Sequence, residues 1–146
     1  MKFKLIIDKT KDEEIVATVH GRTELTDKIE ALVMAYEKSD RIVAYSEDDI
    51  KILKFGEIEC ITAVEGKICA IDSQGEMYRL KQRLYELEKI LPTSFIRINK
   101  SSFANENGIK KFSATFSGGV DAVFKCGYRE YVSRRCFAVI KRRYEL

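Results

Sequence analysis

Basic side chains stand at several points where the chain is predicted to turn or to begin a helix. Lys67 follows a predicted turn, Lys100 lies within a polar one, and Arg134 and Arg135 follow Ser133, a predicted helix N-cap. Side chains at such positions project beyond the backbone and can reach a partner. Lysine and arginine neutralise phosphates, and their donors match O6 and N7 of guanine. Each residue alone is more often a solvated surface charge, but together they predict a surface that binds a phosphate-bearing partner.

The distribution of charge along the chain favours the same interpretation. Residues 1–75 hold 11 Lys and Arg against 16 Asp and Glu, a net charge of −5. Residues 76–146 hold 15 Lys and Arg against 7 Asp and Glu, a net charge of +8, within an overall formal charge of +3. Such an asymmetry between the two halves indicates an anionic partner for the carboxyl-terminal half. We expect that partner to be nucleic acid.

No arrangement of acid, base, nucleophile or metal ligands in the sequence predicts catalysis. The single histidine, His20, lies beside a predicted strand end and is typical of a structural residue. The segment Ser117-Gly118-Gly119 lacks the lysine and the strand-to-helix context of a phosphate-binding loop, so it predicts a hairpin turn. The four cysteines form no CxxC pair, and we expect them to be buried apolar residues or free thiols. We therefore expect no enzymatic activity, no metal site and no cofactor.

Length and composition predict one folded domain with a small appended unit. The chain has 146 residues, of which 45% are hydrophobic, enough for a core. Its apolar runs are far shorter than the roughly 20 residues that span a bilayer. The amino-terminal apolar run is also too short for a signal peptide. We therefore expect a cytoplasmic protein that has no membrane segment.

Residues 1–45 predict a small β-β-α unit. Phe3, Leu5 and Ile7 lie at alternate positions, on one face of residues 2–7, and residues 15–19 are largely β-branched, so the two segments predict strands that pair with each other. A helix is expected over residues 26–38. Its apolar stripe either packs within the monomer or helps the chain to form a homodimer, and it consists of Ile29, Leu32, Val33 and Tyr36.

Residues 46–146 predict a second, mainly β domain, so that the fold class of the chain is α+β and mainly β. A helix with a leucine face is expected over residues 81–90, stopped by Pro92. A final helix is expected after Ser133, with an inward face of Cys136, Phe137, Ile140 and Tyr144. Short strands are expected at residues 41–46, 50–55, 58–64, 67–71, 77–80, 95–98, 101–104, 108–112, 120–125 and 128–132.

Several motifs in the second domain stand in the order and spacing of a known family. The span from Ile52 to Tyr144 resembles the LytTR (LytR/AlgR-type) DNA-binding domain. Two pieces make the resemblance specific: residues 84–91, which are similar to the family's L-x-x-L-E-x-x-L helix, and residues 95–101, similar to its F-x-R-x-H-R/K-S signature. The remaining pieces are residues 58–67, similar to the early strand and turn, Asn105 with Ile109, similar to V-N-x-x-x-I, and Gly127 with residues 131–135, similar to G-x-x-x-x-V-S-R-R/S.

The resemblance implies a mainly β fold of short sheets whose loops enter successive major grooves of duplex DNA. By position it implies base contacts from Lys67, Lys100 and Arg135, and phosphate or supporting contacts from Arg134 and Ser101. Arg97 is also a DNA-binding candidate, although its extended segment suits hydrogen bonds that hold the loop.

Two positions depart from the family pattern, and one domain that most members carry is not expected here. Asn99 stands where the family has His, and Thr62 where Glu is common. Neither departure touches the basic candidates, but both bear on which site sequence is read. Only about fifty residues precede the matching span, too few for a receiver domain, so control by aspartate phosphorylation within the chain is not expected.

Residues and resemblance together predict a bacterial, sequence-specific, double-stranded-DNA-binding transcriptional regulator that binds promoter repeats as a dimer or as paired monomers. Two other classes remain open at this point. One is a small protein-interaction module for an acidic partner, and the other is a binder of single-stranded RNA that stacks bases on Phe and Tyr. Competition between duplex and single strands separates the RNA binder from the DNA binder, whereas salt dependence does not.

Overall fold

The computed structural model describes residues 1–144, and the side chains of residues 37–39 lie outside that description. The chain divides into two compact units, Met1–Ala35 and the residues from Tyr36 onward. The division falls within helix α1 (Glu24–Ser39), most of which belongs to the first unit.

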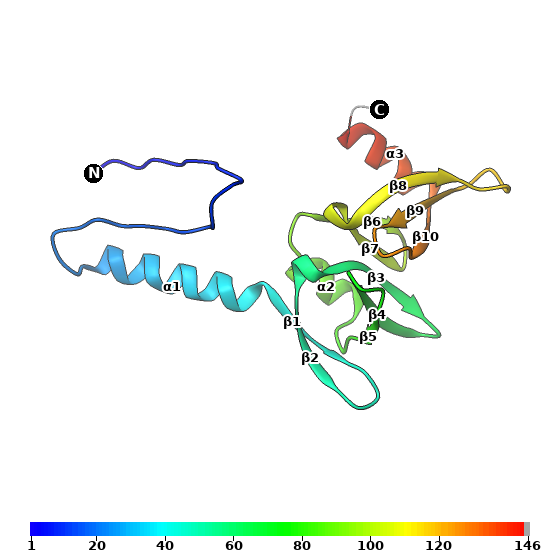
Figure 1. Ribbon diagram of the computed structural model, residues 1–146, viewed down its shortest axis with the longest axis horizontal. Coiled ribbons are helices and arrows are strands. Elements are labelled where there is room, and N and C mark those ends of the chain that lie inside the picture. Colours follow the sequence, from blue (N-terminus) through cyan, green and yellow to red (C-terminus); the bar gives the residue numbers. More distant parts are fainter. Residues whose placement is uncertain (145–146) are drawn as a thin grey trace. The chain divides into compact units, whose positions relative to one another are not determined.

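The first unit consists of an irregular segment followed by most of α1 (Figure 1). The helix confirms the one predicted over residues 26–38 and begins slightly earlier. It does so because the Asp27 N–H donates to the Thr23 carbonyl oxygen at 3.1 Å. Arg22 forms ion pairs with Asp27 (2.9 Å) and with Glu30, so two carboxylates of the helix share one guanidinium.

The strands predicted at residues 2–7 and 15–19 are wrong, because neither segment forms a strand ladder. Phe3, Leu5 and Ile7 occupy alternate positions, yet they are 91%, 73% and 82% exposed. An isolated two-stranded ribbon buries too little apolar surface to be stable in water. Of the predicted β-β-α unit, only the helix is therefore present in this structure.

The second unit begins earlier than residue 46, the predicted start of the second domain. Strand β1 (Arg41–Tyr45) pairs along its whole length with β2 (Ile50–Lys54), from Arg41 opposite Lys54 to Tyr45 opposite Ile50. A strand belongs to the sheet whose neighbouring strands form hydrogen bonds with its backbone N–H and C=O groups. Residues 41–45 are therefore part of the second unit.

A seven-stranded antiparallel sheet forms the larger layer of the second unit, in the order β2-β1-β5-β4-β3-β7-β6 (Figure 1). A three-stranded sheet, in the order β10-β9-β8, forms the smaller layer. The strands predicted from residue 41 onward are confirmed, with ends that differ by one or two residues. The remaining strands are β3 (Ile58–Val64), β4 (Lys67–Asp72), β5 (Met77–Arg79), β6 (Phe95–Asn99), β7 (Ser102–Asn105), β8 (Ile109–Ala114), β9 (Val120–Phe124) and β10 (Arg129–Val132).

Two apolar clusters lie on opposite faces of the large sheet, and β3 contributes to both. Ile61 belongs to the cluster that contains Leu87 of helix α2 (Leu84–Ile90). Cys60, the preceding residue, belongs to the cluster that contains Phe124 of the small sheet and Ile140 of helix α3 (Arg134–Arg143). Successive side chains of a strand point to opposite faces, so β3, which is covered on both sides, buries side chains on both of its faces.

Helix α2 begins at Leu84, three residues after the predicted start at residue 81. The preceding residues continue the sheet, because the Leu80 N–H donates to the Ile68 carbonyl oxygen at 2.8 Å. The helix then starts where the Glu86 carboxylate accepts the Arg83 N–H at 3.1 Å. Two short 3₁₀ turns complete the unit, η1 (Phe55–Glu57) and η2 (Glu106–Gly108).

The described cysteines fit the expected pattern of buried or free thiols. Cys60 and Cys69 are buried, Cys126 and Cys136 are half-buried, and none of the four forms a disulfide. Burial raises the pKa of the Cys60 thiol well above its usual range. Over residues 1–144, the helices are all too short or too polar to cross a membrane.

The packing of α2 yields a test of the larger core. Leu87 is fully buried, whereas Tyr85 on the same helix is 61% exposed. Leu87→Ala is expected to lower the free energy of unfolding by about 2–5 kcal/mol, since it leaves a cavity under the helix. Tyr85→Ala is the matched control, with an expected loss below about 1 kcal/mol. Urea denaturation measures both, and equal losses would contradict the described packing.

Candidate nucleic-acid interface

Lys67 stands at a tight turn that only a few residue types can form. Glu65 and Gly66 have positive φ angles of 51° and 78°, and Val64 pairs directly with Lys67. This is the two-residue hairpin turn that matches the twist of its strands, and Gly at its second position removes the strain of a positive φ. The turn fixes Lys67 as an exposed side chain at the start of β4.

Lys100 lies in the β6–β7 turn, whose carbonyl oxygens are held by Arg97. The Arg97 Nε donates to the Asn99 carbonyl oxygen at 2.9 Å, and its Nη2 donates to the Lys100 carbonyl oxygen. The guanidinium also stacks on Phe103, 4.7 Å from the ring centroid. Arg97 is thus engaged in holding the loop, while the Lys100 side chain stays exposed.

Arg134 and Arg135 occupy the first turn of α3, which Ser133 caps as predicted. The Ser133 Oγ accepts the Cys136 N–H at 3.1 Å. Cations at a helix N-terminus oppose the helix dipole by about 0.3–1 kcal/mol each. The first turn of α3 contains no acidic residue to offset them. The two arginines therefore do not stabilise their helix, and their position favours an external anion.

We call these segments the three basic loops: the β3–β4 turn with Lys67, the β6–β7 turn with Lys100, and the β10–α3 junction with Arg134 and Arg135. Hydrogen bonds tie them together. The Ala63 N–H donates to the Ser101 carbonyl oxygen at 3.2 Å, which joins the first two loops. The Ser133 N–H donates to the Ile98 carbonyl oxygen at 2.8 Å, which joins the last two.

Asn99 bridges two of the three basic loops with both ends of its side-chain amide. Its Nδ2 donates to the Tyr131 carbonyl oxygen at 2.7 Å, and its Oδ1 accepts the Ser101 N–H at 2.8 Å. Asn99 is the position at which the sequence departs from the family's usual His. The amide at this position serves to position Lys100 and Arg134. In the sequence, this role is indicated only by the departure from the family pattern.

The sequence did not predict a partly buried cluster of polar side chains around Glu130, next to the three basic loops. The Glu130 Oε1 accepts hydrogen bonds from Thr62, from Ser102 at 3.2 Å and from the Tyr128 hydroxyl at 3.3 Å. Glu130 lies on β10 of the small sheet, whereas Thr62 and Ser102 lie on β3 and β7 of the large one. Burial raises the pKa of the Tyr128 phenol, and the neighbouring Glu130 charge raises it further.

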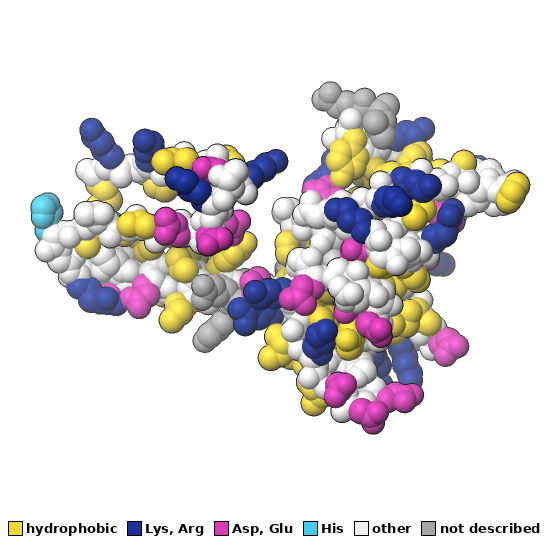
Figure 2. Space-filling model, viewed as in Figure 1, with side chains coloured by type: hydrophobic (Ala, Val, Ile, Leu, Met, Phe, Trp, Pro, Cys, Tyr) yellow, Lys and Arg dark blue, Asp and Glu magenta, His cyan; other side chains and the backbone are white. Residues whose placement is uncertain are grey.

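The cations of the three basic loops have no carboxylate partner within residues 1–144. Arg129 pairs with Asp121 at 3.4 Å and Arg143 with Glu106 at 3.3 Å, so other arginines of the unit are neutralised. Figure 2 shows Lys and Arg side chains gathered over β8–β10 and α3, and acidic ones at the free end of the β1–β2 hairpin. Positive charge is thus concentrated and left unpaired at one part of the unit.

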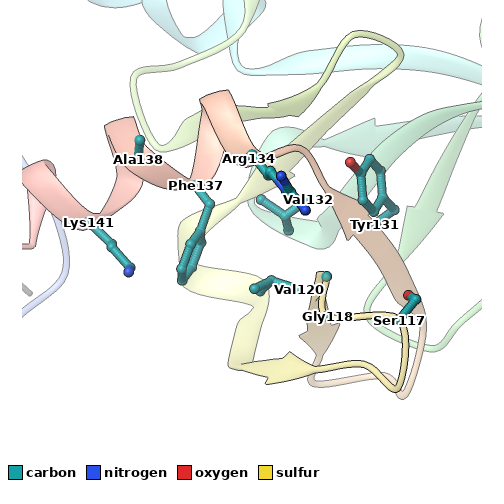
Figure 3. Close-up of a pocket in the computed structure, with 10 residues that line it drawn as sticks. Ser117, Gly118, Val120, Tyr131, Val132, Arg134, Phe137, Ala138 and Lys141 are labelled. Carbon is teal, nitrogen blue, oxygen red and sulfur yellow. The ribbon is translucent and has the colours of Figure 1, made fainter.

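A shallow recess of about 480 Å³ adjoins the β10–α3 junction (Figure 3). It lies between the β8–β9 turn and α3, with Phe137 and Val120 on its apolar wall and Arg134 and Lys141 at its rim. It contains no acid, base or nucleophile arranged for catalysis. Nowhere in the described residues do three or more His, Cys, Asp or Glu side chains meet as a metal site.

The family model of the LytTr DNA-binding domain matches residues 48–145, about two-thirds of the chain. The chain belongs to this family. A solved LytTr DNA-binding domain, from a methyl-accepting/DNA response regulator of Bacillus cereus, has the same fold, with a TM-score of 0.66. It is 21% identical and covers 73% of this chain and 98% of its own.

Relatives from Staphylococcus aureus match nearly the whole LytTR chain, including the first unit. A protein of strain NCTC 8325 is 32% identical over 98% of this chain and 97% of its own length. A protein of the bovine strain RF122 is 31% identical over the same shares. Both are named uncharacterized HTH-type transcriptional regulators. The predicted family and the mainly β fold are thus confirmed.

The bridging role of Asn99 can be tested without altering any basic residue. Asn99→Ala removes two hydrogen bonds, each of about 0.5–1.5 kcal/mol, that hold Lys100 and the β10–α3 junction. We expect affinity for a preferred duplex, selected from random sequences, to fall about tenfold in a fluorescence anisotropy titration. Asn99→His, the residue usual in the family, is expected to retain most of the affinity. Full binding by Asn99→Ala would show that the bridge is dispensable.

Proposed function

We propose that this LytTR protein is a sequence-specific transcriptional regulator that reads duplex DNA in successive major grooves. One observation carries the proposal: three loops far apart in sequence are tied by hydrogen bonds, and each presents a basic side chain without an ion-pair partner in the described chain. A rigid surface with unpaired donors suits the fixed pattern of base edges in a major groove.

Within this proposal Lys67, Lys100 and Arg135 contact base edges, since each is exposed at a loop tip or a helix start. Arg134 and Ser101 contact phosphates, and the exposed first turn of α3 adds backbone N–H groups to that contact. Arg97 supports the β6–β7 turn through its carbonyl oxygens. Its binding contribution is therefore indirect.

The proposal also covers where the protein acts and whether it catalyses a reaction. The names of the Staphylococcus aureus relatives support a role in transcription, and we propose that the protein carries out this role on promoter DNA in the cytoplasm. No catalytic step is part of the function.

We also propose that the first unit joins two chains into a homodimer that binds repeated half-sites. Its support is apolar surface that α1 leaves exposed on one face: Leu32 is 71% exposed, and Leu25, seven residues earlier and so on the same face, is 42% exposed. Exposed apolar surface on one face of a helix is typical of interaction sites. The match to the Staphylococcus aureus relative covers 98% of this chain, so that relative contains the first unit as well.

The homodimer can be tested with the full chain by sedimentation velocity. Leu32→Glu places a charge on the exposed apolar surface of α1 and is expected to shift the dimer to monomer. Ala31→Glu makes the same change in charge at the neighbouring exposed position and is expected to leave the dimer intact. A wild-type chain that sediments as a monomer at all concentrations would end the proposal.

The base contacts can be tested once a preferred duplex has been selected from random sequences. Lys100→Ala and Arg135→Ala are each expected to cost about 1–3 kcal/mol on that duplex. Their loss on a scrambled duplex is expected to be much smaller. Lys54→Ala, on the distant edge strand β2, is the control with the same loss of charge. Equal losses on both duplexes would demote the two residues to phosphate contacts.

The same titration separates the two other functions that the sequence left open. A single-stranded RNA competitor that displaces the duplex at equal concentration would favour the RNA binder. Absence of any preferred duplex in the selection would favour the module for an acidic protein partner. A preference of 10³-fold or more for the selected duplex is the result expected of a specific regulator.

A further inference from the structure

A second recess, of about 720 Å³, opens beside Lys67 on the side of α2. Its walls come from the start of β4, the end of β5, the first turn of α2 and β6. The segment between β5 and α2 forms its floor. The residues that line it are Gly66, Lys67, Ile68, Arg79, Leu80, Lys81, Gln82, Arg83, Leu84, Tyr85, Glu88 and Arg97. Arg79, Lys81 and Arg83 took no part in the interface described above.

The recess gathers positive charge that the rest of the unit does not neutralise. It is lined by five cations and by one carboxylate, that of Glu88. Arg79 and Arg83 are exposed and form no ion pair with any residue of the described chain. Lys81 lies over the Tyr45 ring, 4.6 Å from its centroid, a contact that leaves its charge unpaired.

The buried thiol of Cys69 provides independent evidence that two of these cations act at one place. Cys69 pairs directly with Arg79 across the β4–β5 ladder. Burial raises the pKa of the Cys69 thiol, and Lys67 and Arg79 both oppose that rise. Both positive charges are therefore close enough to act on the same group. Like charges held together repel, so the arrangement costs stability unless an anion binds.

The recess is continuous with the three basic loops. Lys67 belongs to both the recess and the β3–β4 turn, and Arg97 lines the recess while holding the carbonyl oxygen of Lys100. A long polyanion that lies on the three basic loops therefore passes the mouth of the recess. A small anion bound in the recess alone makes no use of this continuity.

We propose that the recess binds the phosphate backbone of the same duplex, with Arg79 and Arg83 as sequence-independent phosphate contacts. The inference rests on the proposed function and extends its DNA footprint from the base-reading loops to the segment between β5 and α2. Phosphate contacts set the position of a protein on the duplex and carry no base information. Arg79 and Arg83 thus contribute affinity, and the three basic loops contribute specificity.

The test is the salt dependence of binding by the full chain carrying Arg79→Gln and Arg83→Gln. Each phosphate contact contributes about 0.9 to the slope of log K against log salt concentration. The double variant is therefore expected to lower the magnitude of the slope by about 1.8, while the ratio of affinities for selected and scrambled duplex stays unchanged. Lys54→Gln with Lys89→Gln is the control, with the same charge change at exposed positions outside the recess, and its slope is expected to match that of the wild type.

A slope unchanged in a folded double variant overturns the inference, and so does an equal fall in the control. A second arm measures thermal stabilisation by inorganic pyrophosphate without DNA. Stabilisation of the wild type that is lost in the double variant, with an unchanged slope on DNA, would assign the recess to a small anion instead. If the wild type prefers no duplex at all, the proposed function fails. Failure of the recess alone leaves the duplex preference intact.

Discussion

The packing of the small sheet against one face of the large one is the constraint on which the interface depends. Phe124 and Ile140 are buried against Cys60, Ala104 and Ile98, so strands β9 and β10 and helix α3 are fixed over β3, β7 and β6. This contact brings the β10–α3 junction to the β6–β7 turn, where hydrogen bonds then join the two. Without it Arg134 and Arg135 would have no defined place relative to Lys100, some thirty residues earlier in the chain.

Polar groups then select one register of that packing. Apolar contacts are non-directional and tolerate small shifts between two sheets. The half-buried Glu130 carboxylate does not, because a shift would separate it from its hydrogen-bond donors. Its hydrogen bonds to Thr62 and Ser102 reach across the two sheets, as does that of the Glu59 carboxylate with the Cys126 N–H at 2.9 Å. The loops above are thus placed by directional bonds that lie beneath them.

The cations of the three basic loops differ from the residues that stabilise the fold. Arg129 and Arg143 lie in ion pairs and add to the structure, whereas Arg134 and Arg135 stand against a helix dipole without partners. Gly66 allows the tight turn before Lys67, and the Arg97 guanidinium donates hydrogen bonds to the carbonyl oxygens of the β6–β7 turn. The side chains that stabilise the fold are therefore distinct from those proposed to contact DNA, so basic residues of the loops can change without loss of the fold.

The sequence by itself determined the local elements of the second unit and the family. The strands from residue 41 onward, the Ser133 cap and the basic turn positions follow from periodicity, β-branched residues and turn chemistry, which act between near neighbours in the chain. The same reasoning failed for residues 2–7 and 15–19. The alternate apolar positions of the first segment and the β-branched residues of the second are typical of strands. A strand also needs a partner edge, however, and neither segment pairs with one.

Only the tertiary structure decided which residues from distant parts of the chain lie next to one another. The bridge by Asn99, the carboxylate of Glu130 under the loops and the gathering of Arg79 and Arg83 beside Lys67 join positions separated by tens of residues. No local pattern encodes such pairs, because sheet order and the packing of two layers fix them. The sequence placed basic side chains at turns, and the fold turned those separate positions into one surface.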